Sequence, residues 1–107
     1  VDLKDLVQFS DEPVRRTVFE TDRLWSQAVC LDRNQTFGPV ADSGADAVLT
    51  VIAGEAVVLV ERKRRRLKQW GAALVPAGSE VTITNASLDP LVVLVITAPP
   101  PAREPGG

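Results

Sequence analysis

Short apolar runs separated by turn-forming residues recur along almost the whole chain. Eight of them read as strands: 14–19, 24–31, 47–53, 56–61, 65–70, 73–75, 80–85 and 91–98. In several, apolar and polar residues alternate, which is the period-two pattern of a strand with one buried face. Gly, Pro, Asn or Asp stands between the runs and indicates tight connections. Many short strands with tight connections predict an all-β sandwich or barrel.

The run at 80–85 alternates most clearly. Val81 and Ile83 fall on one face of the predicted strand, whereas Thr82 and Thr84 fall on the other. Because the apolar face of such a strand packs on the core, we expect Val81 to point inward.

The two ends of the chain depart from this strand pattern. Leu3, Leu6 and Val7 have helical spacing, which predicts one or two short helical turns within the first eight residues. Residues 101–107 lack core-forming side chains and are rich in Pro and Gly, which predicts a flexible tail. A length of 107 residues supports one core, so residues 1–100 are predicted to form a single domain.

Composition narrows the classes of function. The chain has no histidine, tyrosine or methionine, and its apolar content of 45% is ordinary for a globular protein. No apolar run approaches the roughly 20 residues that span a bilayer, and no segment has the pattern of a signal peptide. The single cysteine, Cys30, cannot form a disulfide within the chain. We therefore expect a soluble cytoplasmic protein without membrane contact.

Two stretches together have the spacing of a known motif pair. The first stretch contains Ile52-Ala53-Gly54-Glu55, which has the pattern of a hairpin. In the second stretch, Pro76-Ala77-Gly78 is followed by Asn85, seven residues after the glycine. With this spacing the sequence resembles the cupin superfamily, small double-stranded β-helix barrels that are often dimers. The resemblance covers about residues 14–100 and implies a jelly-roll-like barrel.

The resemblance also locates the positions that hold a metal ion in the family, usually three histidines and a glutamate. Counted from the two motifs, these positions are Val40, Asp42, Ala47 and Val81. A catalytic transition-metal site generally needs three protein ligands, and only Asp42 could donate to a metal. The sequence therefore predicts a metal-free barrel without a cofactor.

A degenerate pocket inside the barrel is the site that the resemblance implies. Its candidate ligand-binding residues are Val40, Asp42, Ala47, Leu49, Val81, Ile83, Trp25 and Cys30. Trp25 could offer a stacking face, although structural packing is the commoner role of a tryptophan. Cys30 lies on an apolar strand, where a cysteine usually behaves as a small buried hydrophobe. Trp70 stands where the family usually has a turn glycine, and it could cover a barrel end or face a partner subunit.

These observations favour a binding or structural module, a homodimer whose interior holds a small ligand or is filled by its own side chains. The dimer rests on the resemblance and on the all-apolar run Leu91–Ile96, both faces of which need cover. One alternative is a metal-independent isomerase or epimerase with Asp42 or Glu80 as base, although such catalysis typically uses His or Tyr. A second alternative is an anion or nucleic-acid contact through the basic run from Arg62 to Arg66, which otherwise forms a solvated hairpin tip.

Overall fold

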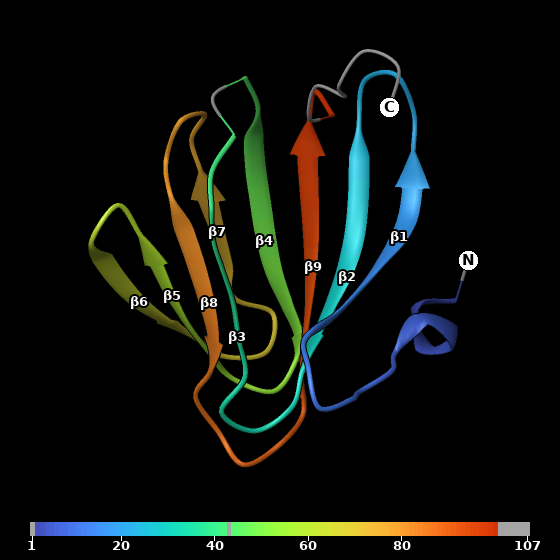
Figure 1. Cartoon of the computed structure of the whole chain (residues 1–107), viewed down its shortest axis with the longest axis vertical. Coiled ribbons are helices and arrows are strands. Elements are labelled where there is room, and N and C mark those ends of the chain that lie inside the picture. The colour runs from blue at the N-terminus through green and yellow to red at the C-terminus, as the bar shows by residue number, and fades with distance from the viewer. Residues whose placement is uncertain (1, 43, 101–107) are drawn as a thin grey trace.

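Two antiparallel sheets face each other and enclose the core (Figure 1). The computed structural model describes residues 2–42 and 44–100, and within them nine strands and one short 3₁₀ helix are found. The five-stranded sheet has the order β1 (Val14–Glu20), β2 (Trp25–Leu31), β9 (Leu91–Ala98), β4 (Asp46–Ala53) and β7 (Ala72–Val75). The four-stranded sheet has the order β3 (Thr36–Val40), β8 (Val81–Asn85), β5 (Ala56–Val60) and β6 (Lys63–Leu67). The predicted all-β barrel is confirmed.

The core lies between the sheets and is built by side-chain alternation. On the central strand β9, Val93 pairs with Val29 of β2 and Val51 of β4, and all three side chains are fully buried. Val81 and Ile83 of β8 join the same cluster from the opposite sheet, so the predicted inward face of this strand is confirmed. Apolar residues spaced two apart thus meet across the two sheets, because each strand has only one inward face.

The basic run forms a strand rather than a hairpin tip. Only Glu61 and Arg62 make the turn between β5 and β6, and both have positive φ, 46° and 72°. Two such residues form the tight turn that matches the twist of a hairpin, and a two-residue loop fixes the register, so that Lys63 pairs with Val60. The strand predicted at 65–70 is therefore displaced: β6 ends at Leu67, and Trp70 lies in the following turn with φ 72°.

Strand β3 was not predicted, because Gly38 and Pro39 in its middle are typical of a turn. The strand tolerates them because it is an edge strand that pairs with β8 alone, with a register shift between Phe37 and Val40. Gly38 has φ 102°, and a Cβ atom there would lie 2.5 Å from the carbonyl oxygen of Val81. A glycine is therefore required at the point where β3 crosses β8 closely.

The N-terminal segment contains a short helix, as predicted. It spans Leu3–Leu6 as a 3₁₀ helix, and the Asp2 carboxylate accepts the Lys4 backbone N–H at 2.9 Å as its cap. The tail predicted at 101–107 lies outside the described residues. Within the described part of the chain, no helix has the length and hydropathy that crossing a membrane requires.

Candidate functional site

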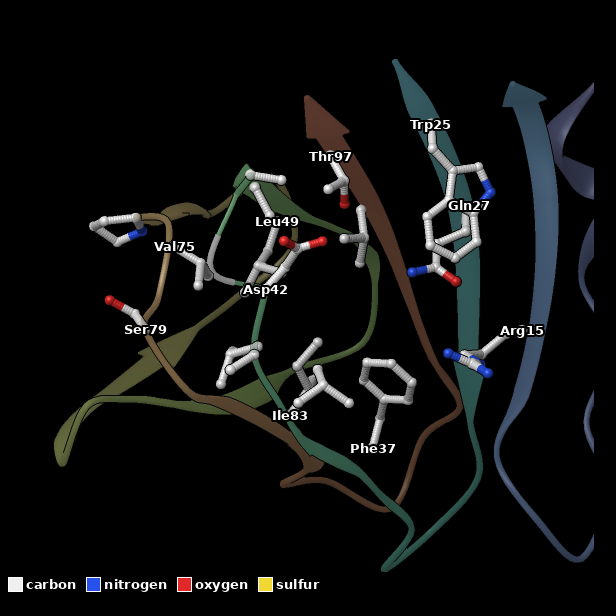
Figure 2. Close-up of a pocket in the computed structure, with 17 residues that line it drawn as sticks. Arg15, Trp25, Gln27, Phe37, Asp42, Leu49, Val75, Ser79, Ile83 and Thr97 are labelled. Atoms are coloured by element: carbon white, nitrogen blue, oxygen red, sulfur yellow. The ribbon is translucent and has the colours of Figure 1, made fainter. Parts of the chain in front are cut away.

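One end of the barrel is filled and the other holds a pocket. Leu31 and Leu91 lie where β2 ends and β9 begins, and both are fully buried in the core. At the opposite end, Trp25 and Thr97 pair across the same two strands and line a pocket of about 180 Å³ (Figure 2). The interior of the barrel is therefore filled by side chains at one end and open at the other.

Most of the predicted site residues line this pocket. They come from four strands and the loop after β3, and they are Val40, Asp42, Ala47, Leu49, Val81, Ile83 and Trp25. Cys30 does not line it. Cys30 alternates with the core residues Val29 and Leu31 along β2, so it lies on the opposite face of the strand, where it is fully buried. That placement matches the role of a small buried hydrophobe.

The four positions counted from the motif spacing converge on the pocket although they come from separate segments. Val40, Ala47 and Val81 contribute aliphatic groups, and Asp42 contributes the one carboxylate of the four. This donor set does not fit a transition metal, which prefers imidazole, thiolate or several carboxylates. Within residues 2–42 and 44–100, no group of three His, Cys, Asp or Glu side chains could hold a metal ion.

The Pro76-Ala77-Gly78 segment fixes the loops at the mouth of the pocket. The Gly78 backbone N–H donates to the Asp42 carbonyl oxygen at 2.7 Å, and the Ala77 N–H donates to Asp46 Oδ1 at 2.8 Å. Asp42 Oδ1 accepts the Gly44 N–H at 2.8 Å. The loop between β7 and β8 is thereby joined to the loop between β3 and β4, and Asp42 is positioned at the pocket.

Two buried polar side chains in the pocket lack a protein partner. Gln27 of β2 is 6% exposed and Thr97 of β9 is 7% exposed, and both line the pocket. No residue described in the structure forms a hydrogen bond with either side chain. Among the described residues, no side-chain nitrogen or oxygen is fully buried without a hydrogen bond, so the amide of Gln27 and the hydroxyl of Thr97 must reach the open space of the pocket. Their free donors and acceptors are therefore available to a molecule in the pocket.

Arg15 brings a positive charge to the same pocket. It is exposed on β1, opposite Val29 of β2, and its guanidinium carbon lies 5.3 Å from the centre of the Phe37 ring on β3. Cation–π stacking of this kind orients a guanidinium without using its N–H donors. The contact also joins β1 to β3, the edge strands of the two sheets. Figure 2 shows Arg15 and Asp42 on different sides of the pocket.

The other candidates lie elsewhere. Glu80 is exposed and does not line the pocket; its backbone carbonyl accepts the Glu61 N–H at 3.1 Å. Trp70 is 70% exposed, and its backbone N–H donates to the Val51 carbonyl oxygen at 2.7 Å. Alternation along β6 divides the basic run between two faces, and Arg66 is paired with Glu55 at 2.8 Å.

Sequence reasoning missed the polar residues Arg15, Gln27 and Thr97. Gln27 shares the face of Trp25 because the two residues are two positions apart in a strand, so its place was detectable from alternation. Arg15 was not detectable in this way, since its neighbour Phe37 belongs to the unpredicted strand β3.

Solved structures resemble the whole fold. The protein TT1209 from Thermus thermophilus is 31% identical, with a TM-score of 0.90 over 94% of this chain and 97% of that one. A double-stranded β-helix protein from Klebsiella pneumoniae is 22% identical, with a TM-score of 0.87 over 97% and 96% of the two chains. A cupin superfamily protein from Desulfitobacterium hafniense is 18% identical, with a TM-score of 0.79 over 92% and 88%. No family model and no curated protein sequence matches this chain.

Proposed function

We propose that this chain, whose fold is that of the cupin superfamily, keeps the barrel pocket of that fold, lacks a metal centre, and binds a small, mainly apolar molecule. The aliphatic side chains at three of the four motif positions support the absence of a metal centre. These aliphatic side chains also favour an apolar molecule, because its entry removes apolar surface from water on both sides of the contact.

The unpaired side chains of Gln27 and Thr97 carry this proposal. Both residues are more than nine-tenths buried, yet their polar atoms are not sealed in the core and so are exposed only toward the pocket. A ligand with one or two polar groups would form hydrogen bonds with the Gln27 amide and the Thr97 hydroxyl. Few polar groups within an apolar lining is the usual composition of a small-molecule site.

The volume sets the size of the ligand. A cavity of about 150 Å³ lined by apolar side chains is sufficient for benzene. The pocket of about 180 Å³ therefore accommodates a body of roughly one ring with a small substituent.

Binding is favoured over catalysis by the placement of the carboxylates. Of the two considered as a base, only Asp42 lines the pocket, and its Oδ1 already accepts the Gly44 N–H. General acid–base catalysis needs a group within hydrogen-bond reach of the reacting proton, which Glu80 outside the pocket does not satisfy.

A homodimer is part of the proposal, formed through the outer face of the five-stranded sheet. Leu74 pairs with Val48, which pairs with Ile96, so three apolar side chains form one row across β7, β4 and β9. Leu74 is 61% exposed and Val48 is 41% exposed. A second copy suits this row because a two-fold interface places a surface against itself, and an uncharged row does so without opposing like charges.

Titration of the ¹⁵N-labelled protein with benzyl alcohol, a ring with one hydroxyl group, tests the binding site. We expect saturable shifts of the Gln27 side-chain amide and the Thr97 backbone amide. Ala47→Phe, which places a ring in the pocket, should abolish them, whereas Val48→Phe on the outer face of the same strand should not. Shifts that do not saturate, or that persist in Ala47→Phe, would contradict the proposal.

A further inference from the structure

The free guanidinium of Arg15 points to the chemical class of the ligand. In residues 2–42 and 44–100, Arg15 has no ion pair and donates no hydrogen bond. Its stacking on Phe37 leaves its five N–H donors unused. A planar fork of donors held in this way matches the two oxygens of a carboxylate.

Gln27 lies within reach of the same anion. Arg15 pairs with Val29, and Thr17 pairs with Gln27, so Arg15 and Gln27 are diagonal neighbours on the inward face of β1 and β2. Long side chains at diagonal positions reach a shared partner. Figure 2 shows the Gln27 amide beside Arg15, between it and Trp25.

The charged side chains that line the pocket favour a ligand with a single negative charge. Asp42 lies on a different side of the pocket from Arg15 (Figure 2), so a ligand anion is attracted to one side and repelled from the other. One arginine compensates one charge. A dianion such as a phosphate ester would retain an uncompensated charge in a pocket that is otherwise mainly apolar.

We propose that the pocket binds a small monocarboxylic acid, whose carboxylate accepts hydrogen bonds from Arg15 and Gln27 and whose apolar body lies among Leu49, Val75 and Ile83. This inference rests on the proposed function, because it assigns the ligand class of the same pocket. Thr97 is left to bind a second, neutral polar group of the acid.

Three probes that share one ring distinguish the carboxylate from other groups: benzoate, benzamide and phenyl phosphate. Their dissociation constants are measured by NMR titration of the full chain at low salt. Benzoate should bind about tenfold more tightly than benzamide, which is the usual gain from a charge-assisted hydrogen bond. Phenyl phosphate should bind more weakly than benzoate.

Arg15→Gln tests the residue itself, with Arg16→Gln as its matched control. Arg16 is the next residue on β1, and its side chain donates to Gln8 Oε1 at 3.1 Å rather than lining the pocket. Arg15→Gln should weaken benzoate about tenfold and leave benzamide within about twofold, and Arg16→Gln should change neither.

Each other outcome overturns a distinct part of the account. Equal affinity for benzoate and benzamide, or an equal loss of both in Arg15→Gln, refutes the carboxylate and leaves the pocket as a neutral site. If phenyl phosphate binds most tightly of the three probes, the ligand class is a phosphate ester and not a carboxylic acid. Saturable binding by none of the three probes, nor by benzyl alcohol, refutes the proposed function together with the inference.

Discussion

The side-chain amide of Asn85 donates to the carbonyl oxygen of Leu31 at 3.0 Å, across 54 positions of the sequence. It thereby joins the end of β8 in one sheet to the end of β2 in the other. The same amide donates to the Asp89 carbonyl oxygen at 2.9 Å, and Asn85 Oδ1 accepts the Ser87 N–H at 3.0 Å. One buried side chain thus holds the loop between β8 and β9 at the filled end of the barrel.

Asn85→Ala should lower the free energy of unfolding by about 2–3 kcal/mol, because it leaves buried backbone groups unpaired. Urea denaturation followed by tryptophan fluorescence measures the change. Gln69→Ala is the control, since the exposed Gln69 amide also donates to a backbone carbonyl, that of Ile52 at 3.0 Å. The control should cost less than about 1 kcal/mol. Equal losses in the two variants would contradict the role of Asn85.

Thr97→Val should raise the free energy of unfolding of the ligand-free protein only slightly, by up to about 0.5 kcal/mol, because it removes a pocket-facing hydroxyl without a protein partner at nearly constant volume. Ser26→Ala should have the opposite effect, a loss of about 1 kcal/mol, because Ser26 Oγ accepts the Phe19 N–H at 3.1 Å. Both values come from urea denaturation. A destabilised Thr97→Val protein would mean that the hydroxyl has a structural partner.

Trp70→Gly should raise the free energy of unfolding by about 0.5–1 kcal/mol. A non-glycine residue in the left-handed region is strained, and Trp70 has φ 72°. Its exposed side chain contributes little packing that the substitution would remove. Thermal and urea denaturation check the change, and a loss of stability on substitution would show that the indole stabilises the fold.

Val48→Asp should convert a dimer to a monomer at micromolar concentration, since the buried charge weakens association by about 100-fold or more. Sedimentation velocity gives the mass. Leu59→Asp is the matched control: Leu59 is 40% exposed on β5 in the other sheet, and its substitution should leave the dimer intact. A monomeric wild-type protein would refute the proposed dimer. Equal effects of the two variants would show that the interface is not specific to the outer face of the five-stranded sheet.

The barrel was predictable from period-two alternation and the spacing of turn residues, and the resemblance of the motif spacing located seven of the 17 residues that line the pocket. Val81 and Ile83 are examples, because a strand with one apolar face has one way to pack. Strand β3 was hidden because Gly38 and Pro39 resemble a turn, and an edge strand tolerates them. The start of β6 depended on Glu61 and Arg62 adopting positive φ, which their residue types do not favour.

The polar part of the pocket was harder to predict for a related reason. Arg15 reaches Phe37 from another sheet, and no local pattern records which edge strands meet when a barrel closes. That Gln27 and Thr97 lack partners is likewise a property of the assembled pocket, because alternation fixes the face of a side chain and leaves its hydrogen bonds undetermined.

The central claim is that the pocket binds a small molecule without a metal ion. Its most direct test is the affinity for benzyl alcohol before and after exhaustive dialysis against EDTA, together with elemental analysis of the purified protein. The account predicts an unchanged dissociation constant and a metal content far below one ion per chain. Near-stoichiometric metal in the protein, or binding that is lost on chelation and restored by adding the ion, would contradict it.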